Sequence, residues 1–304
     1  MTHSGKMMET VSRSARGFGS SAGRIRCFLE SLMMPDGGFR GRGAESDLYY
    51  TAFALDCMTA LGIDVASDEA VEYLTAFGVG DGLDLVHLAC LARCWSRVGR
   101  QRLSGACLSG IIDNIEGCRS DDGGYHRERN AEYGSIYGCF FAESAYQDLG
   151  LEIPDPSGVV RSIKALKTSD GLFKAERGIA LVTTNAVAGA ILLLNSLDGS
   201  IEGFGVSWLI EQCHEDGGFV AAPKAPVPDL VSTATALFAL QEAGAPLGSI
   251  RERCRTFVEG LWDDKGGFSG HWLDDTVDCE YTFYGLLSLG VLWGGDSQRA
   301  KSKE

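Results

Sequence analysis

Apolar residues return every three or four positions in six stretches spread along the chain. The first stretch holds Ile25, Phe28, Leu29 and Leu32, a spacing that predicts an amphipathic helix with one face against a core. The six stretches are residues 21–33, 67–77, 103–117, 156–167, 203–213 and 248–261. Stretches that are apolar on all sides alternate with them, as is typical of helices enclosed by other helices.

A short glycine turn, usually with an aromatic residue, follows each amphipathic stretch. The turns begin at Asp36, Asp81, Asp122, Asp170, Asp216 and Lys265, at intervals of 45, 41, 48, 46 and 49 residues. Self-similarity at such a period is the mark of a repeat architecture. The chain therefore consists of six units, each holding one amphipathic and one enclosed helix.

Each enclosed stretch opens on a carboxylate or hydroxyl residue and closes fifteen positions later, five times out of six on glycine. The pairs are Asp47/Gly62, Asp84/Gly99, Ser135/Gly150, Thr183/Asp198, Asp229/Gly244 and Asp275/Gly290. Such residues cap helix starts and helix ends. We predict an all-α fold, an (α/α)6 toroid over residues 21–293, with mobile segments at 1–20 and 294–304. All six enclosed helices would begin at one positively polarised end of the barrel.

Charge and composition narrow the classes of partner. The chain has 304 residues, with 41 Asp and Glu against 27 Lys and Arg, and a net charge of −14. This balance argues against nucleic acid as a partner. Ten scattered cysteines suit reduced core residues, and no apolar run suits a bilayer span or a secretion signal. We expect a soluble cytoplasmic protein.

A glycine-aromatic turn followed by an enclosed helix, six times over, resembles the superfamily of squalene cyclases and protein prenyltransferase β-subunits. The resemblance covers residues 21–293. It implies a toroid that handles isoprenoids, but the superfamily includes both transferases and polyene cyclases, so fold leaves the chemistry open.

The segment from Trp272 to Val277 resembles the Asp-x-Asp-Asp-Thr-Ala motif of class II terpene cyclases, with Trp272 in place of the first Asp. In that family the middle Asp protonates an alkene or epoxide. The resemblance assigns this role to Asp274, with Asp275 and Thr276 in support. A class II type terpene cyclase is therefore the leading hypothesis. The alternative for the two carboxylates is a helix cap on the barrel rim.

Aromatic rings near the starts of the enclosed helices could stabilise carbocations through their faces, although helical spacing also suits core packing. The candidates for substrate binding are Tyr49, Tyr50, Phe53, Tyr133, Tyr137, Trp272, Tyr281 and Tyr284. His87 joins them as a group that could accept a proton or orient a substrate, with a core histidine as the alternative. Glu132, near the start of the third enclosed helix, and Glu280, within the sixth, are each a candidate buried partner or counter-charge.

The first alternative function is a protein prenyltransferase β-like subunit, which would need a partner chain. In that family an Asp, a Cys two positions on and a His hold zinc, whereas here Val231 follows Asp229 and Asp278 takes the place of the His. His271, Asp275 and Cys279 remain as a looser ligand set. We expect no metal or other cofactor for the cyclase, with magnesium or zinc as alternatives.

Two further alternatives stay open. The toroid could bind an isoprenoid or a protein without doing chemistry, or it could be a carbohydrate-active α/α barrel with well-separated carboxylates. The leading hypothesis implies a polyprenyl small molecule as the partner, and association with a membrane surface through that lipid.

Overall fold

The enclosed helices begin where the sequence places a carboxylate or hydroxyl side chain. The computed structural model describes residues 2–200 and 203–301. In it the enclosed helices are α3 (Leu48–Ala60), α5 (Leu85–Val98), α7 (Ile136–Leu149), α9 (Thr184–Leu197), α11 (Leu230–Glu242) and α13 (Cys279–Lys301). The first five are capped by the predicted side chains of Asp47, Asp84, Ser135, Thr183 and Asp229, each of which accepts a backbone N–H of the first turn.

The sixth enclosed helix starts three residues later than predicted. Strand β4 (Gly267–Ser269) pairs with β5 (Val277–Asp278), and β3 (Trp262–Asp263) pairs with β4 on its other side. This pairing keeps the chain extended up to Asp278, so Asp275 cannot begin the helix. Asp278 Oδ1 instead accepts a hydrogen bond from the backbone N–H of Tyr281 at 2.8 Å. The predicted end at Gly290 is also wrong, because α13 continues through it.

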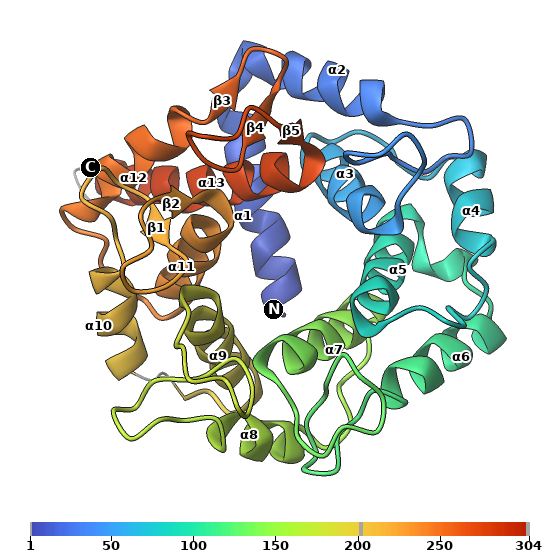
Figure 1. Ribbon diagram of the computed structural model, residues 1–304. Coiled ribbons are helices and arrows are strands. Elements are labelled where there is room, and N and C mark those ends of the chain that lie inside the picture. The colour runs from blue at the N-terminus through green and yellow to red at the C-terminus, as the bar shows by residue number, and fades with distance from the viewer. Residues whose placement is uncertain (1, 201–202, 302–304) are drawn as a thin grey trace.

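The amphipathic helices form an outer ring around the enclosed ones (Figure 1). They are α2 (Ala22–Leu32), α4 (Asp68–Thr75), α6 (Gly105–Glu116), α8 (Pro156–Lys164), α10 (Gly203–Glu211) and α12 (Ile250–Glu259). Each enclosed helix packs against the next, and α13 packs against α3, which closes the ring. The predicted (α/α)6 toroid is confirmed. Strands β1 (Phe219–Val220) and β2 (Pro228–Asp229) form a second small sheet beside α11, and 3-10 turns cover Gly19–Ser21 and Arg100–Arg102.

The glycine turns join neighbouring repeats by close backbone contact. Gly217 has a φ of +91°, and a Cβ there would lie 2.1 Å from the carbonyl oxygen of Arg253 in α12. Gly266, with a φ of +106°, approaches the carbonyl oxygen of Arg24 in α2 in the same way. Only glycine tolerates both this φ and this proximity. The last turn therefore docks on the first outer helix, and the ring closes at this layer too.

The prediction that residues 1–20 form a mobile segment is wrong. Helix α1 (His3–Gly17) lies inside the ring, against α13, α3 and α7 (Figure 1). Val11 and Ala15 are buried, and the hydroxyl of Ser14 donates to the carbonyl oxygen of Leu286 at 2.6 Å. The ring leaves room at its centre, and a helix with one apolar face can bury that face there.

The expected C-terminal tail also differs from the structure. Helix α13 continues to Lys301, so the backbone of residues 294–301 is helical, while residues 302–304 lie outside the described part of the chain. Within residues 2–200 and 203–301, no helix combines the length and the apolar character needed to cross a membrane.

Candidate active site

The centre of the ring holds an apolar cavity of about 140 Å³. All six enclosed helices contribute to it in the same register, through the sixth residue after each cap. These residues are Phe53, Cys90, Phe141, Gly189, Thr235 and Tyr284. Further rings from Phe140, Phe238 and Phe283 enclose the cavity, and Met7 of α1 lines it as well. The cavity is therefore walled by aromatic and aliphatic side chains and limited in depth by the N-terminal helix.

The second residue after each cap lies nearer to the helix starts, at what we call the mouth of the cavity. Tyr49, Tyr137, Asn185 and Val231 hold this register position in four helices, and all four line the cavity. Glu280 holds it in α13. Val86 holds it in α5, and neither Val86 nor Glu280 lines the cavity, so Glu280 is linked to the cavity through its hydrogen bond with Tyr49.

Glu280 and Tyr49 form a hydrogen-bonded pair at the mouth. The Tyr49 hydroxyl donates to Oε1 of Glu280 at 2.7 Å. Burial raises the pKa of Glu280, and the charge of Asp278 adds to this effect. Burial also raises the pKa of Tyr49, so its hydroxyl stays neutral. The hydrogen bond from Tyr49 lowers the pKa of Glu280 without cancelling the rise. The pair thus combines a carboxyl group of raised pKa with a phenol that lines the cavity.

The opposite end of the cavity carries a buried cation. The Arg93 guanidinium lies 4.7 Å from the ring centroids of both Phe53 and Phe283. Its Nε donates to Oδ2 of Asp56 at 2.5 Å, and Nε of Arg97 donates to Oδ1 at 2.6 Å. Burial opposes the ionisation of Asp56, but the two guanidinium charges outweigh it and hold its pKa below the usual range.

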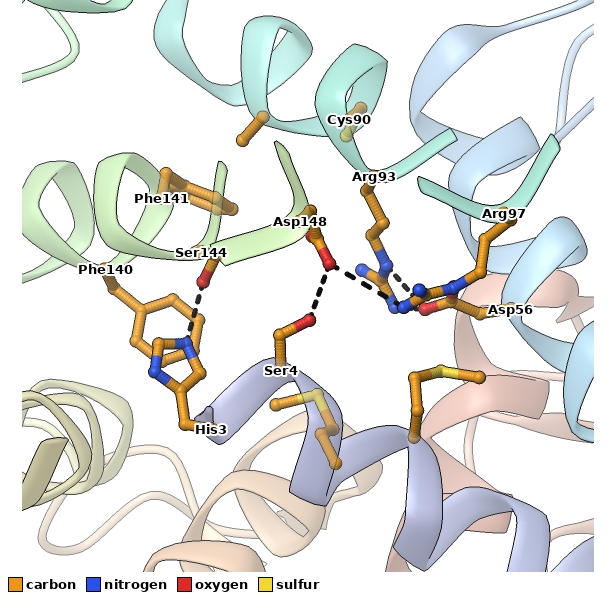
Figure 2. Close-up of a pocket in the computed structure, with 13 residues that line it drawn as sticks. His3, Ser4, Asp56, Cys90, Arg93, Arg97, Phe140, Phe141, Ser144 and Asp148 are labelled. Carbon is orange, nitrogen blue, oxygen red and sulfur yellow. Dashed lines mark hydrogen bonds and ion pairs between the residues drawn. The ribbon is translucent and has the colours of Figure 1, made fainter. Parts of the chain in front are cut away.

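Helix α1 is fastened beside this cation by polar contacts (Figure 2). Ser4 Oγ donates to Oδ1 of Asp148 at 2.7 Å, and burial raises the pKa of Asp148. The ring of His3 stacks on Phe140, with Nε2 at 2.9 Å from the hydroxyl of Ser144. These groups line a smaller pocket of about 60 Å³ that shares Arg93 with the central cavity.

Four of the nine residues predicted to bind substrate meet in the cavity. They are Tyr49, Phe53, Tyr137 and Tyr284. The other five lie elsewhere. His87 is held by the cap of α5, with Nδ1 at 2.7 Å from Oδ1 of Asp84.

The remaining four aromatic candidates pack around the rim. Arg42 lies over the ring of Tyr281 at 5.2 Å, and Arg177 lies over the ring of Tyr133 at 3.7 Å. Trp272 packs against Phe257, with centroids 5.3 Å apart, and Tyr50 packs edge-on against Tyr49 at 5.5 Å. None of these four lines the central cavity.

The three residues predicted to be catalytic lie in the loop before α13. Asp274 precedes the cap by four residues, and its Oδ1 accepts the backbone N–H of Thr276 at 2.9 Å. Hydrogen bonds from Thr276 lower the pKa of Asp274, which is opposite to what a proton donor needs. Asp275 is exposed. The extended β5 segment keeps Asp274, Asp275 and Thr276 away from the cavity lining, so the geometry does not fit the role predicted for them.

The looser metal-ligand set does not assemble. Nδ1 of His271 accepts the backbone N–H of Leu273 at 3.1 Å, and the thiol of Cys279 is directed to the carbonyl oxygen of Tyr50 at 3.1 Å. Asp275 is exposed on the loop between them. Across residues 2–200 and 203–301, no group of three or more His, Cys, Asp or Glu side chains is placed to hold a metal ion.

Several site residues escaped sequence analysis, above all Arg93, Asn185, Thr235 and Met7. The signal that could have found the first three is the register itself, since the cavity is lined by the sixth residue after every cap and by the second and ninth residues after four of the six caps. Arg93 is the ninth residue after Asp84. Nothing in the pattern of α1 indicates that Met7 enters the barrel.

A closed ring of six helical hairpins around an apolar cavity defines an α/α toroid protein. The model of the prenyltransferase alpha-alpha toroid domain matches residues 3–132, 85–183 and 186–302. The chain belongs to this family. No curated protein matches it in sequence.

Solved structures with the same fold are distant in sequence. Type II terpene cyclase MstE from Scytonema is 13% identical, with 95% of this chain and 99% of that chain covered and a TM-score of 0.59. A protein from Actinoplanes is 15% identical, with 90% and 98% covered and a TM-score of 0.59. The GH76A alpha-1,6-mannanase from Salegentibacter is 12% identical, with 95% and 98% covered and a TM-score of 0.56. Likeness at this level establishes the fold alone.

Proposed function

We propose that this protein is a class II type terpene cyclase that holds an isoprenoid in its central cavity and starts cyclisation by protonation. The observation that carries the proposal is the pair of Glu280 and Tyr49 at the mouth of an aromatic cavity. The acid differs from the one expected from sequence, since Glu280 is hydrogen-bonded to the cavity-lining Tyr49, whereas Asp274 is hydrogen-bonded within its own loop.

Protonating an alkene requires an acid that is protonated at rest and faces an apolar space. Burial raises the pKa of Glu280 against the opposing effect of the hydrogen bond from Tyr49, which shifts Glu280 toward the first condition. For the transfer, protonated Glu280 donates to the hydroxyl oxygen of Tyr49, the reverse of the hydrogen bond seen in the structure. Its proton passes to that oxygen while the phenolic proton of Tyr49 moves to the terminal alkene carbon. The Glu280 carboxylate left behind takes back a proton when the final carbocation loses one, so the product is an isomer of the substrate.

The walls of the cavity suit the carbocations formed after that step. The rings of Phe53, Tyr137 and Tyr284 offer negative faces to a developing positive charge. Arg93 at the far end repels such a charge and already occupies one side of Phe53. The cation is therefore favoured near the mouth, beside the carboxylate of Glu280.

The size of the cavity limits the substrate. A cavity of about 150 Å³ holds a molecule of the size of benzene. The 140 Å³ here accordingly takes the reacting end of a short isoprenoid, with the remainder directed to the mouth. An MstE variant has been solved with geranylgeranyl dihydroxybenzoate as substrate, at 13% identity, which recommends prenylated aromatics as test compounds beside polyprenyl diphosphates and squalene.

The test is mass-spectrometric product analysis of the purified protein with these substrates, with and without magnesium. We expect a cyclised isomer of unchanged mass that is lost in Glu280→Gln and reduced at least tenfold in Tyr49→Phe. Asp274→Asn is the matched control and should retain activity. Loss of product in Asp274→Asn with full activity in Glu280→Gln would refute the assignment of the acid. Failure to convert any of the substrates would refute the cyclase proposal.

A further inference from the structure

Two cysteine thiols from neighbouring repeats lie in contact at the outer wall of the ring. Cys213 follows the end of α10, and Cys254 lies within α12. Their Sγ atoms are 3.7 Å apart. Cys254 is fully buried, whereas Cys213 is partly exposed to solvent. The contact lies beside the turn in which Gly217 docks on the backbone of Arg253.

We propose that Cys213 and Cys254 are a redox-active pair that a hydroperoxide converts into a disulfide. The thiolate of Cys213 attacks the peroxide, the O–O bond breaks, and a sulfenic acid forms on Cys213 with release of water or an alcohol. The sulfur of Cys254 then attacks the Cys213 sulfur. The S–S bond forms, and the hydroxyl group leaves as water with the proton from Cys254. Two thiols are oxidised and one peroxide is reduced.

The surroundings assign the two roles. The hydrogen bond from Cys254 lowers the pKa of Cys213, and the charge of Arg253 lowers it further against the effect of burial. The same hydrogen bond and burial raise the pKa of Cys254. Cys213 is thus the accessible nucleophile that reacts first, and Cys254 is the protected thiol that resolves the sulfenic acid.

The two thiols need only a small movement to form a disulfide bond. A disulfide places its sulfur atoms about 2.0 Å apart, so side-chain rotation must close less than 2 Å. The bond would tie the Gly217 turn of the fifth repeat to the outer helix of the sixth. Because it closes a loop of 41 residues, we expect oxidation to raise Tm by about 5 °C.

Peptide mapping of the full-length protein tests the proposal. The protein is treated with one to two equivalents of hydrogen peroxide, denatured, alkylated and digested. We expect a peptide pair joined through Cys213 and Cys254, about 2 Da lighter than the sum of the reduced peptides and separated again by dithiothreitol. Cys90 and Cys94, which are both buried in α5, serve as internal controls: they should remain reduced during peroxide treatment and be fully alkylated afterwards.

Two variants separate the roles. Cys254→Ser should leave a sulfenic acid on Cys213 that dimedone traps, whereas Cys213→Ser should leave Cys254 reduced. Complete alkylation of both cysteines after peroxide treatment of the wild-type protein would overturn the proposal. So would a sulfenic acid on Cys213 of the wild-type protein that persists without forming the bond.

Discussion

Replacing Asp56 with Asn would leave two buried guanidinium groups without their counter-charge. The side chain of Asp56 is 1% exposed and accepts hydrogen bonds from Nε of both Arg93 and Arg97. Removing one partner of a buried ion pair destabilises more than the pair itself contributes, because the remaining charge stays desolvated. The variant keeps the size of the side chain, so the change isolates the charge.

The magnitude follows from the burial of this pair. Breaking such a pair costs about 3–5 kcal/mol in the free energy of unfolding, which corresponds to a fall in Tm of about 5–8 °C for a chain of this length. The pKa of Asp56 is lowered in the folded state, so its contribution is fully present above the unfolded pKa of about 3.9 and disappears as the pH falls through the folded value. The stability difference should therefore be constant between about pH 8 and pH 5.

Thermal and urea unfolding at several pH values would measure this difference. Asp148→Asn is the matched control, because burial raises the pKa of Asp148 and its nearest cation, Arg97, lies 3.8 Å away. We expect a loss below about 1 kcal/mol for the control, because a raised pKa means that the folded state disfavours the charge of Asp148. A loss of that size for Asp56→Asn, or a difference between wild type and variant that grows as the pH falls, would refute the argument.

Three further outcomes are expected. Because burial raises the pKa of Glu280, the rate of cyclisation should decline as the pH rises through the pKa of Glu280 in the folded protein. The free energy of unfolding of the wild type relative to Glu280→Gln should fall over the same pH interval. A pH-independent rate of cyclisation would contradict the role of Glu280 as the acid. Asp229→Ala removes the cap of α11 and should lower the free energy of unfolding by about 1 kcal/mol, whereas Asp275→Ala on the exposed loop should change it by less than about 0.5 kcal/mol; equal losses in a denaturant titration would be inconsistent with the observed caps. Met7→Ala should deepen the cavity and let longer isoprenoids bind, measured by calorimetry with prenyl chains of increasing length; an unchanged length preference would show that Met7 does not limit depth.

Much of the toroid could be predicted because its signals are local. Asp47, Asp84 and Asp229 cap helices wherever the chain places them, since the hydrogen bond to the first turn spans only two or three residues. The predicted start of the sixth enclosed helix is wrong for a reason that is not local. Asp275 and Asp278 are both acceptable caps, and the pairing of β4 with β5 decides between them.

The three-residue error in the start of α13 also explains why the predicted catalytic residues differ from those at the cavity. A helix starting after Asp275 would direct Asp274 and its neighbours to the barrel end, whereas the observed start places Tyr284 in the cavity lining and Glu280 against Tyr49. A change of three residues turns a helix face by most of a turn, so an error of this size exchanges lining residues for rim residues.

Sequence by itself determined the six repeats, the alternation of amphipathic and enclosed helices, and the first five caps, because periodicity and capping depend on neighbours within a few positions. Tertiary structure alone decided that α1 enters the ring, that Arg93 and Asp56 meet at the far end of the cavity, and that Tyr49 meets Glu280. Those contacts join residues up to 277 positions apart in the chain. The contact of Tyr49 with Glu280 forms only when α13 closes the ring against α3, and no local pattern encodes which side chains that closure brings together.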